Sequence, residues 1–316
     1  MKKIIYLVIP CYNEEAVLYE TSKQLEIKMS KLMENNKISN KSKIVFINDG
    51  SKDSTWNIIT DLHNKSKIFS GINLSKNRGH QNALVAGLMT VRKYCDAAIS
   101  LDADLQDDIS VIDEFIDKFI EGYDIVYGVR NSRKKDTYFK RLTAQGFYKF
   151  MNKMGANIVY NHADYRLMSK RALDGLKEFK EVNLFLRGII PMIGYKTDIV
   201  EYERHERFAG ESKYPFKKMM SFAIDGITSL SIKPIRFITG LGFTIFAISI
   251  IMLLYFLNTY FRGKAIEGWT TIVISMWSIG GLQLLAIGII GEYIGKIYME
   301  VKSRPRFIIE EFLNEK

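Results

Sequence analysis

Residues 4–15 read Ile4-Ile5-Tyr6-Leu7-Val8-Ile9-Pro10-Cys11-Tyr12-Asn13-Glu14-Glu15, an apolar run that passes directly into a polar cluster. The same order returns along residues 1–130, where short β-rich runs alternate with amphipathic helical patterns. The β-rich runs are Ile4–Ile9, Lys43–Asn48, Ile68–Leu74, Ala97–Leu101 and Asp124–Val129, and the helical patterns cover Ala16–Met33, Ser54–His63 and Asn82–Lys93. Strands that alternate with helices predict an α/β fold with a mostly parallel sheet and helices on both of its faces.

Polar clusters follow three of these predicted strands, at the edge of the sheet where α/β proteins bind ligands. The clusters are Pro10–Glu15, Asn48–Ser51 and Asp102–Asp107. Two acids separated by one residue just beyond a strand, such as Asp102 and Asp104, can face one pocket. Their carboxylate oxygens are hard ligands that suit Mg²⁺ or Mn²⁺. An exposed acidic turn has the same pattern, so the pair by itself is a weak signal.

Apolar stretches without a charged residue occur only late in the chain, over Phe237–Phe261 and Gly268–Gly291. A bilayer core of about 30 Å needs roughly 20 helical residues, so each stretch is long enough to span it. The alternative is a hairpin buried in a soluble protein. The expected division is a cytosolic catalytic domain over 1–212, a juxtamembrane amphipathic segment over 213–234, transmembrane helices over 235–261 and 268–294, and a cytosolic tail over 295–316.

Basic residues flank the two apolar stretches and predict their orientation. The link between the two stretches contains only two basic residues, Arg262 and Lys264. The flanking basic residues are Lys213, Lys217, Lys218, Lys233 and Arg236 before the stretches, and Lys296, Lys302, Arg304 and Arg306 after them. The positive-inside rule then places both termini and the catalytic domain in the cytoplasm, in a multi-pass protein of the cell membrane. Glycines of the second stretch, Gly280 and Gly281 among them, would permit close packing between helices. A homo-oligomer is therefore a possible arrangement.

The composition excludes several other classes of protein. With 47% apolar and 25% charged residues, the 316-residue chain is neither disordered nor collagen-like. The formal net charge is +10, but the basic residues gather beside the apolar stretches and no nucleic-acid-binding module is present. Nucleic acid is therefore not an expected partner. The two cysteines, Cys11 and Cys95, cannot form a disulfide framework and fit a reducing compartment.

Six motifs occur in the order of a known family, and the resemblance to that family covers essentially the whole chain. They are Val8–Glu15, Asn48–Asp53, Arg78–Gln81, Leu101–Asp107, Asp164–Met168 and Arg207–Tyr214. The first four resemble family-two glycosyltransferases of the GT-A fold. The last two are similar to the polyprenyl-phosphate branch of that family, which includes dolichol-phosphate mannosyltransferases and bacterial undecaprenyl-phosphate glycosyltransferases with two C-terminal membrane helices.

This resemblance implies an inverting enzyme that moves a hexose or N-acetylhexosamine from a nucleotide sugar to polyprenyl (undecaprenyl) phosphate. The product would be a polyprenyl-phosphate monosaccharide for cell-envelope glycan modification. The resemblance also implies Mg²⁺ or Mn²⁺ as cofactor, and UDP is preferred over GDP as the nucleotide. Two alternatives stay open: a transferase that uses another lipid or protein hydroxyl acceptor, and a non-enzymatic membrane scaffold. A processive polysaccharide synthase is disfavoured because its Gln-x-x-Arg-Trp motif is missing.

By the same resemblance, three groups of residues form the site. The nucleotide sugar is bound by Pro10, Tyr12, Glu14, Asp49, Arg78, Asp102, Asp104 and Gln106, with Asp102 and Asp104 on the metal ion. The donor diphosphate and the acceptor phosphate are bound by Arg166, Arg187, Arg207, Ser212 and Lys213. The catalytic residues are Asp164, Asp104, Arg207 and Lys213. We expect Asp102, Asp104 and Asp164 to lie in one place.

Each assignment has a competing structural interpretation. Asp49 before a glycine fits a plain turn, and Asp164 beside Arg166 fits a buried ion pair. His80 fits a donor contact as well as helix capping or packing. The arginines and lysines fit solvated surface charge.

Overall fold

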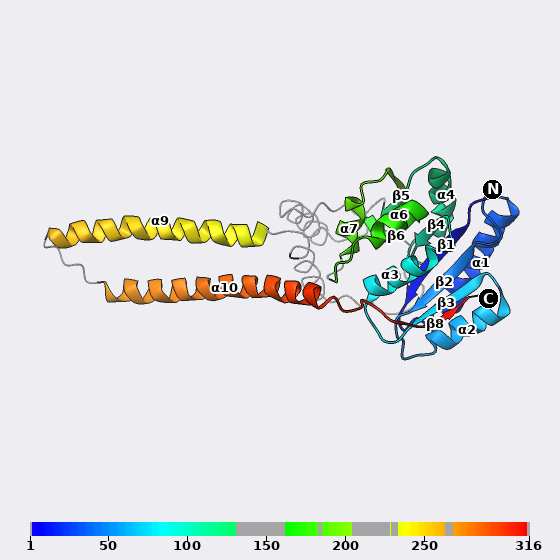
Figure 1. The fold of residues 1–316 in the computed structure, drawn as a ribbon, viewed down its shortest axis with the longest axis horizontal. Helices are drawn as coiled ribbons and strands as arrows, with labels where there is room; N and C mark the ends of the chain where they lie inside the picture. The colour runs from blue at the N-terminus through cyan, green and yellow to red at the C-terminus, as the bar shows by residue number, and fades with distance from the viewer. Residues whose placement is uncertain are drawn as a thin grey trace.

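The computed structural model describes residues 2–130, 162–182, 185–203, 228, 233–262 and 268–314. These residues form an α/β unit and a pair of long helices that project from it (Figure 1). Three predicted site residues, Arg207, Ser212 and Lys213, lie outside the described residues, as does most of the predicted juxtamembrane segment.

Among the described residues, eight strands form one sheet in the order β7-β5-β6-β4-β1-β2-β3-β8. The strands are β1 (Ile5–Cys11), β2 (Lys43–Asn48), β3 (Phe69–Leu74), β4 (Ala97–Ser100), β5 (Ile125–Arg130), β6 (His162–Ser169), β7 (Thr197–Tyr202) and β8 (Ile309–Leu313). Strand β1 pairs in parallel with β2 and β4, β2 with β3, and β5 with β7. Strands β6 and β8 run antiparallel to their neighbours. The prediction of a mostly parallel sheet is confirmed.

Helices cover both faces of this sheet, as predicted. Consecutive side chains of a strand point to opposite faces, so Leu7 of β1 packs into one apolar cluster and Val8 into another. One cluster includes residues of α1 (Leu18–Glu34), α2 (Thr55–Lys65) and α4 (Ile112–Ile120), which follows the 3-10 turn η1 (Ile109–Val111). The other includes residues of α3 (His80–Val91), α6 (Lys170–Lys177) and α7 (Leu186–Met192). The central strands are apolar throughout because both faces are buried.

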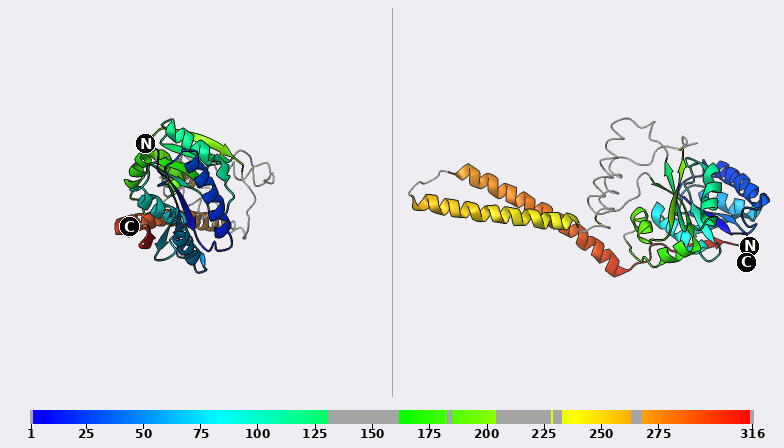
Figure 2. Two further views of the ribbon diagram at one scale, coloured as in Figure 1. Left: turned by 90° about the vertical axis from the view of Figure 1, so that its right-hand side faces the viewer. Right: turned by 90° about the horizontal axis from the view of Figure 1, so that it is seen from above.

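The projecting pair consists of α9 (Lys233–Phe261) and α10 (Trp269–Lys302), which we call the helical hairpin. The two helices lie side by side and extend away from the sheet (Figures 1 and 2). Large apolar side chains are exposed along both: Phe243 is 74% exposed, Leu254 62% and Leu284 72%. These side chains are not buried within a soluble unit.

In the described part of the chain, no helix combines the length with the apolar character that crossing a membrane requires. The two transmembrane helices therefore stay a prediction. Helix α10 also continues to Lys302, beyond the predicted end at 294.

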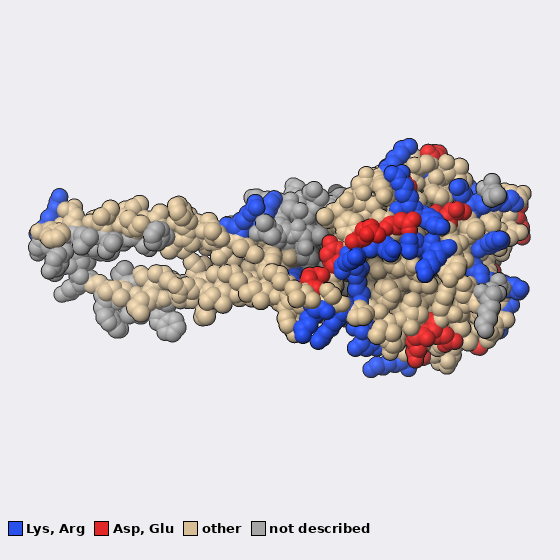
Figure 3. Space-filling model, in the orientation of Figure 1, with Lys and Arg blue, Asp and Glu red and all other residues tan. Residues whose placement is uncertain are grey.

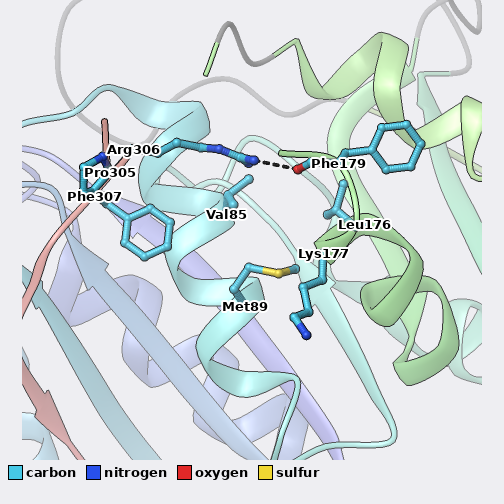
Figure 4. A pocket seen from close by; sticks show the side chains of 8 residues that line it. All are labelled: Val85, Met89, Leu176, Lys177, Phe179, Pro305, Arg306 and Phe307. Carbon is cyan, nitrogen blue, oxygen red and sulfur yellow. Dashed lines mark hydrogen bonds between the residues drawn. The ribbon is translucent and has the colours of Figure 1, made fainter. Parts of the chain in front are cut away.

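The chain beyond α10 returns to the α/β unit. Strand β8 pairs with β3, so the sheet includes residues from the segment predicted as a separate tail. Arg306 donates a hydrogen bond to the Phe179 carbonyl oxygen at 2.6 Å, and the Glu300 carboxylate accepts one from the Val182 amide at 2.9 Å. A cavity of about 290 Å³ lies here between α3, the end of α6 and Phe307 (Figure 4). These contacts fasten the base of the hairpin to the α/β unit.

Candidate functional site

The polar turns after β1 and β2 lie against each other. The Asn13 amide donates to Ser51 Oγ at 3.0 Å, and the Glu14 amide donates to Thr55 Oγ1 at 3.0 Å. Gly50 has a φ of +62°, and a Cβ at this position would lie 2.4 Å from the Asn77 amide nitrogen. Only glycine fits so close to another backbone, which explains the Asn-Asp-Gly order. The Tyr12 side chain projects from this turn and is 37% exposed, while Glu14 is half-buried.

Asp49 is buried at the end of β2 and holds the start of α3. Its carboxylate accepts hydrogen bonds from the backbone amides of Arg78 at 2.7 Å and Gly79 at 2.9 Å. Burial raises the pKa of Asp49 above its ordinary value, against the effect of these two hydrogen bonds. Asp49 is therefore more than a plain turn residue, because it positions the segment that carries Arg78 and His80. The Arg78 Nε is buried and has no hydrogen-bond partner among the described residues.

The loop after β4 carries the predicted metal ligands. Asp104 is 7% exposed, and its Oδ1 accepts a hydrogen bond from the Gln106 amide at 3.2 Å. Leu105, between them, has a φ of 56°, a conformation that side-chain-bearing residues rarely adopt. Pro10 lies inside β1, level with Ile47 of β2, rather than beyond the end of the strand.

Asp102 and Asp164 meet although they are far apart in the sequence. Strand β6 runs antiparallel to β4 with Ser100 level with Arg166, so residues beyond the end of β4 face the start of β6. His80 Nε2 lies 3.7 Å from Asp102 Oδ1 and 3.7 Å from Asp164 Oδ2. His80 therefore links two of the three aspartates that were expected to lie in one place, Asp102 and Asp164.

Two arginines compensate the charge of Asp164. Arg166 donates to Asp164 Oδ1, and Arg187 of α7 donates to Asp164 Oδ2 at 3.3 Å. The Arg166 side chain is 1% exposed, so Asp164 and Arg166 form the buried ion pair that was the alternative interpretation of these two residues. Burial by itself would raise the pKa of Asp164, but the guanidinium groups of Arg187 and Arg166 outweigh it and hold that pKa well below its ordinary value. Asp164 is ionised at any physiological pH.

A second cluster, absent from the predicted site, supports the loop after β4. The Tyr202 hydroxyl donates to Asp107 Oδ1 at 2.5 Å, and Arg130 NH2 lies 3.8 Å from the same oxygen. Burial, with a contribution from the charge of Asp102, raises the pKa of Asp107 to about 6. Asp107 is the last residue of the acidic motif Leu101–Asp107, and Arg130 directly follows the predicted strand Asp124–Val129. These two positions in the sequence could have indicated that Asp107 and Arg130 lie near the site. Their contact with Tyr202, however, depends on the packing of β5 against β7.

The donor set fits a hard divalent cation. Burial raises the pKa of Asp102, and the negative charges of Asp164 and Asp104 raise it further. A cation beside Asp102 and Asp104 would relieve this repulsion. Within the residues that the structure describes, no group of three His, Cys, Asp or Glu side chains could hold a metal ion. Two carboxylates still agree with Mg²⁺, which usually takes its other ligands from water and phosphate oxygens.

Comparison with known proteins gives one family. The family model of Glycosyl transferase family 2 matches residues 6–176. The uncharacterized glycosyltransferase YkoT of Bacillus subtilis (strain 168) is 53% identical over 97% of this chain and 91% of its own. The prophage bactoprenol glucosyl transferase homolog of Escherichia coli (strain K12) is 40% identical over 97% of this chain and 98% of its own.

Among solved structures, the mannosyltransferase PcManGT of Pyrobaculum calidifontis, in complex with GDP-Man and Mn²⁺, aligns with a TM-score of 0.48. Its sequence identity is 15%, over 75% of this chain and 65% of its own.

Proposed function

This chain belongs to glycosyl transferase family 2 and is a glycosyltransferase, and we propose that it transfers a sugar from a nucleotide sugar to polyprenyl phosphate. Support for the acceptor comes from full-length relatives, 40% identical, that are named for bactoprenol, the undecaprenyl lipid. The word glucosyl in those names makes glucose the first sugar to test. The enzymatic family excludes the alternative of a scaffold without activity.

The observation that carries the proposal is the charge arrangement at the edge of the sheet. Asp102 Oδ1 and Asp164 Oδ2 each lie 3.7 Å from His80 Nε2, and Arg187 approaches Asp164 from α7. Asp102 is proposed to face a cation and Asp164 to face the sugar. The half-exposed Arg187 beside them is available to a phosphate group. The segment that Asp49 holds adds a further donor, the buried Arg78 Nε.

The proposed reaction forms one bond and breaks one. A phosphate oxygen of the acceptor attacks the anomeric carbon, and the bond from that carbon to the diphosphate oxygen breaks, so the electron pair leaves with the nucleoside diphosphate. Attack from the face opposite the leaving group inverts the anomeric centre. The acceptor is a phosphate monoester with a second pKa near ~6, so it is largely ionised at neutral pH and needs no strong base.

Asp164 then orients the sugar and stabilises positive charge at the anomeric carbon, since its arginine partners keep it ionised. A divalent cation bound by Asp102 and Asp104 would supply positive charge for the departing diphosphate. Arg187, with Arg207 and Lys213 outside the described residues, is proposed to bind phosphate groups.

We also propose that the helical hairpin holds the site at the membrane surface, with both termini in the cytoplasm. The support is the exposure of its large apolar side chains, which include Phe237 at 71% and Met276 at 69%. The described surface along the hairpin is largely uncharged, whereas lysine and arginine gather at its base (Figure 3). An active site that is anchored at the membrane meets a lipid-bound phosphate more often than an unanchored active site does.

The orientation is testable with single cysteines at the two ends of the hairpin, because the native Cys11 and Cys95 are buried. We expect a membrane-impermeant maleimide to label Arg262→Cys in intact cells, and Ser303→Cys only after permeabilisation. Labelling of both sites in intact cells, or of Ser303→Cys alone, would contradict the proposed orientation.

The reaction is tested with membranes that contain the protein, undecaprenyl phosphate and a panel of radiolabelled nucleotide sugars, UDP-glucose first. We expect label in the lipid phase and equimolar release of UDP. Membranes with Asp104→Ala are the matched control. A panel that leaves no label in the lipid phase above this control would overturn the proposed function.

A further inference from the structure

Two buried tyrosines lie beneath the loop that carries Asp102 and Asp104. Tyr165 comes from β6 and Tyr202 ends β7, and their rings pack edge to face with centroids 5.3 Å apart. The Tyr165 hydroxyl donates to the Asp108 carbonyl oxygen at 3.1 Å, and the Tyr202 hydroxyl donates to Asp107 Oδ1 at 2.5 Å. The two hydroxyl groups thus bind consecutive residues of one loop.

This loop has a conformation that needs support. Leu105, with its φ of 56°, lies between Asp104 and Gln106. A bulky residue stays in the left-handed region only where surrounding contacts enforce it. On the other side of Leu105, Thr21 Oγ1 donates to the Ala103 carbonyl oxygen at 2.7 Å. Hydrogen bonds from three different elements therefore fasten the loop on both sides of its strained residue.

We propose that Tyr165 and Tyr202 are positioning residues, whose hydroxyl groups hold this loop so that Asp102 and Asp104 face the diphosphate of the donor. This inference rests on the proposed function. The rings by themselves would pack equally well as phenylalanine, so apolar packing does not account for the hydroxyl groups. Tyr202 is further tied to the end of β5, because Arg130 Nε donates to its hydroxyl oxygen at 3.3 Å.

The test replaces each hydroxyl group and keeps each ring, in Tyr202→Phe and Tyr165→Phe. The control is Tyr195→Phe, whose ring packs against Arg171 at 4.2 Å and whose hydroxyl group has no hydrogen bond to any described residue. For Tyr202→Phe we expect an increase of about tenfold in the KM for the donor and in the Kd for UDP with Mn²⁺, as for the loss of one hydrogen bond to a charged group. Tyr165→Phe, which loses a neutral acceptor, should show a smaller increase.

A double-mutant cycle separates positioning from a general loss of structure. Asp107→Ala removes the acceptor, so adding Tyr202→Phe should increase the Kd for UDP with Mn²⁺ no further. Additive effects in this cycle would overturn the inference. So would variants that melt at a lower temperature with an unchanged KM and Kd, because that pattern means a structural role only.

The two proposals fail in different ways. If the wild-type protein binds UDP with Mn²⁺ but transfers no sugar, and Tyr202→Phe weakens that binding, the positioning role stands and the proposed function is overturned. If the wild-type protein transfers sugar and Tyr202→Phe behaves like Tyr195→Phe, the positioning role is overturned alone.

Discussion

The start of β6 and the loop after β4 both place aspartates at the same edge of the sheet, but their charges are balanced differently. Asp164 on β6 has Arg166 and Arg187 beside it, and these arginines hold its pKa low. In the loop, Asp102 lies near other carboxylates, and burial with their charges raises its pKa. The charge of Asp164 is therefore balanced by arginines of the protein itself, whereas the carboxylates of the loop repel one another, and the proposed cation would relieve that repulsion.

This difference separates two kinds of function at one edge. A carboxylate paired with buried arginines is preorganised and keeps its charge throughout a reaction. A cluster of carboxylates with excess negative charge binds a cation and, through it, a negatively charged ligand. These two environments agree with the proposed roles, in which the β6 side orients the sugar and the loop holds the diphosphate through a cation.

The loop should be the more sensitive region for catalysis. We expect Asp104→Ala to abolish measurable transfer, a loss of roughly a hundred- to thousandfold, because the charge of the departing diphosphate loses its stabilisation. The measurement is turnover with the donor sugar and undecaprenyl phosphate. Asp61→Ala on the exposed face of α2 is the control. Near-normal turnover of Asp104→Ala would refute the cation role.

The β6 side should be the more sensitive region for stability. Asp164→Asn removes the negative charge that Asp164 places beside the buried Arg166, so we expect the free energy of unfolding to fall by about 3 kcal/mol. Transfer should fall as well, by about a hundredfold. The matched control is Asp174→Asn, which breaks the surface pair with Arg92 and should cost less than about 1 kcal/mol. Equal losses of stability in the two variants, by urea denaturation in detergent, would contradict the comparison.

The smallest expected effect concerns pH and Asp107. Its pKa in the folded protein is about 6, above the ordinary value of about 3.9. As the pH falls from about 6 to about 4, the folded state binds a proton at Asp107 before the unfolded state does. Protonation of Asp107 therefore stabilises the folded state at the low end of this window. This stabilisation is lost as the pH rises. The wild-type protein should lose about 2 kcal/mol relative to Asp107→Asn between pH 4 and pH 6. A pH-independent difference between their unfolding free energies would refute the raised pKa.

Much of the α/β unit was predictable from local patterns. The predicted run Lys43–Asn48 is β2, and the other four runs match β1, β3, β4 and β5 to within one or two residues at each end. Their apolar runs are continuous because both faces of these strands are buried. Strand β6 was missed, since Asp164 and Arg166 interrupt its pattern with charges. Strand β8 was missed because Glu310 and Glu311 give an exposed edge strand the composition of a polar tail.

The motifs identified the residues of the proposed site, but not how these residues are arranged. The motifs marked Asp49, Asp102, Asp104 and Asp164. Nothing local indicated that Asp49 binds the amides of the Arg78 segment or that Tyr202 binds Asp107. These contacts join residues from different strands and loops, so they depend on the order of strands in the sheet.

The sequence by itself determined the alternation of strands and helices, the acidic loop and the apolar stretches, because each depends on neighbouring residues and their periodicity. Only the tertiary structure decided which charges meet. The antiparallel pairing of β6 with β4 brings Asp164 to Asp102, and the return of the chain after α10 adds β8 to the sheet. Pairing between distant strands is selected by the burial of the whole sheet, and no single segment contains that information.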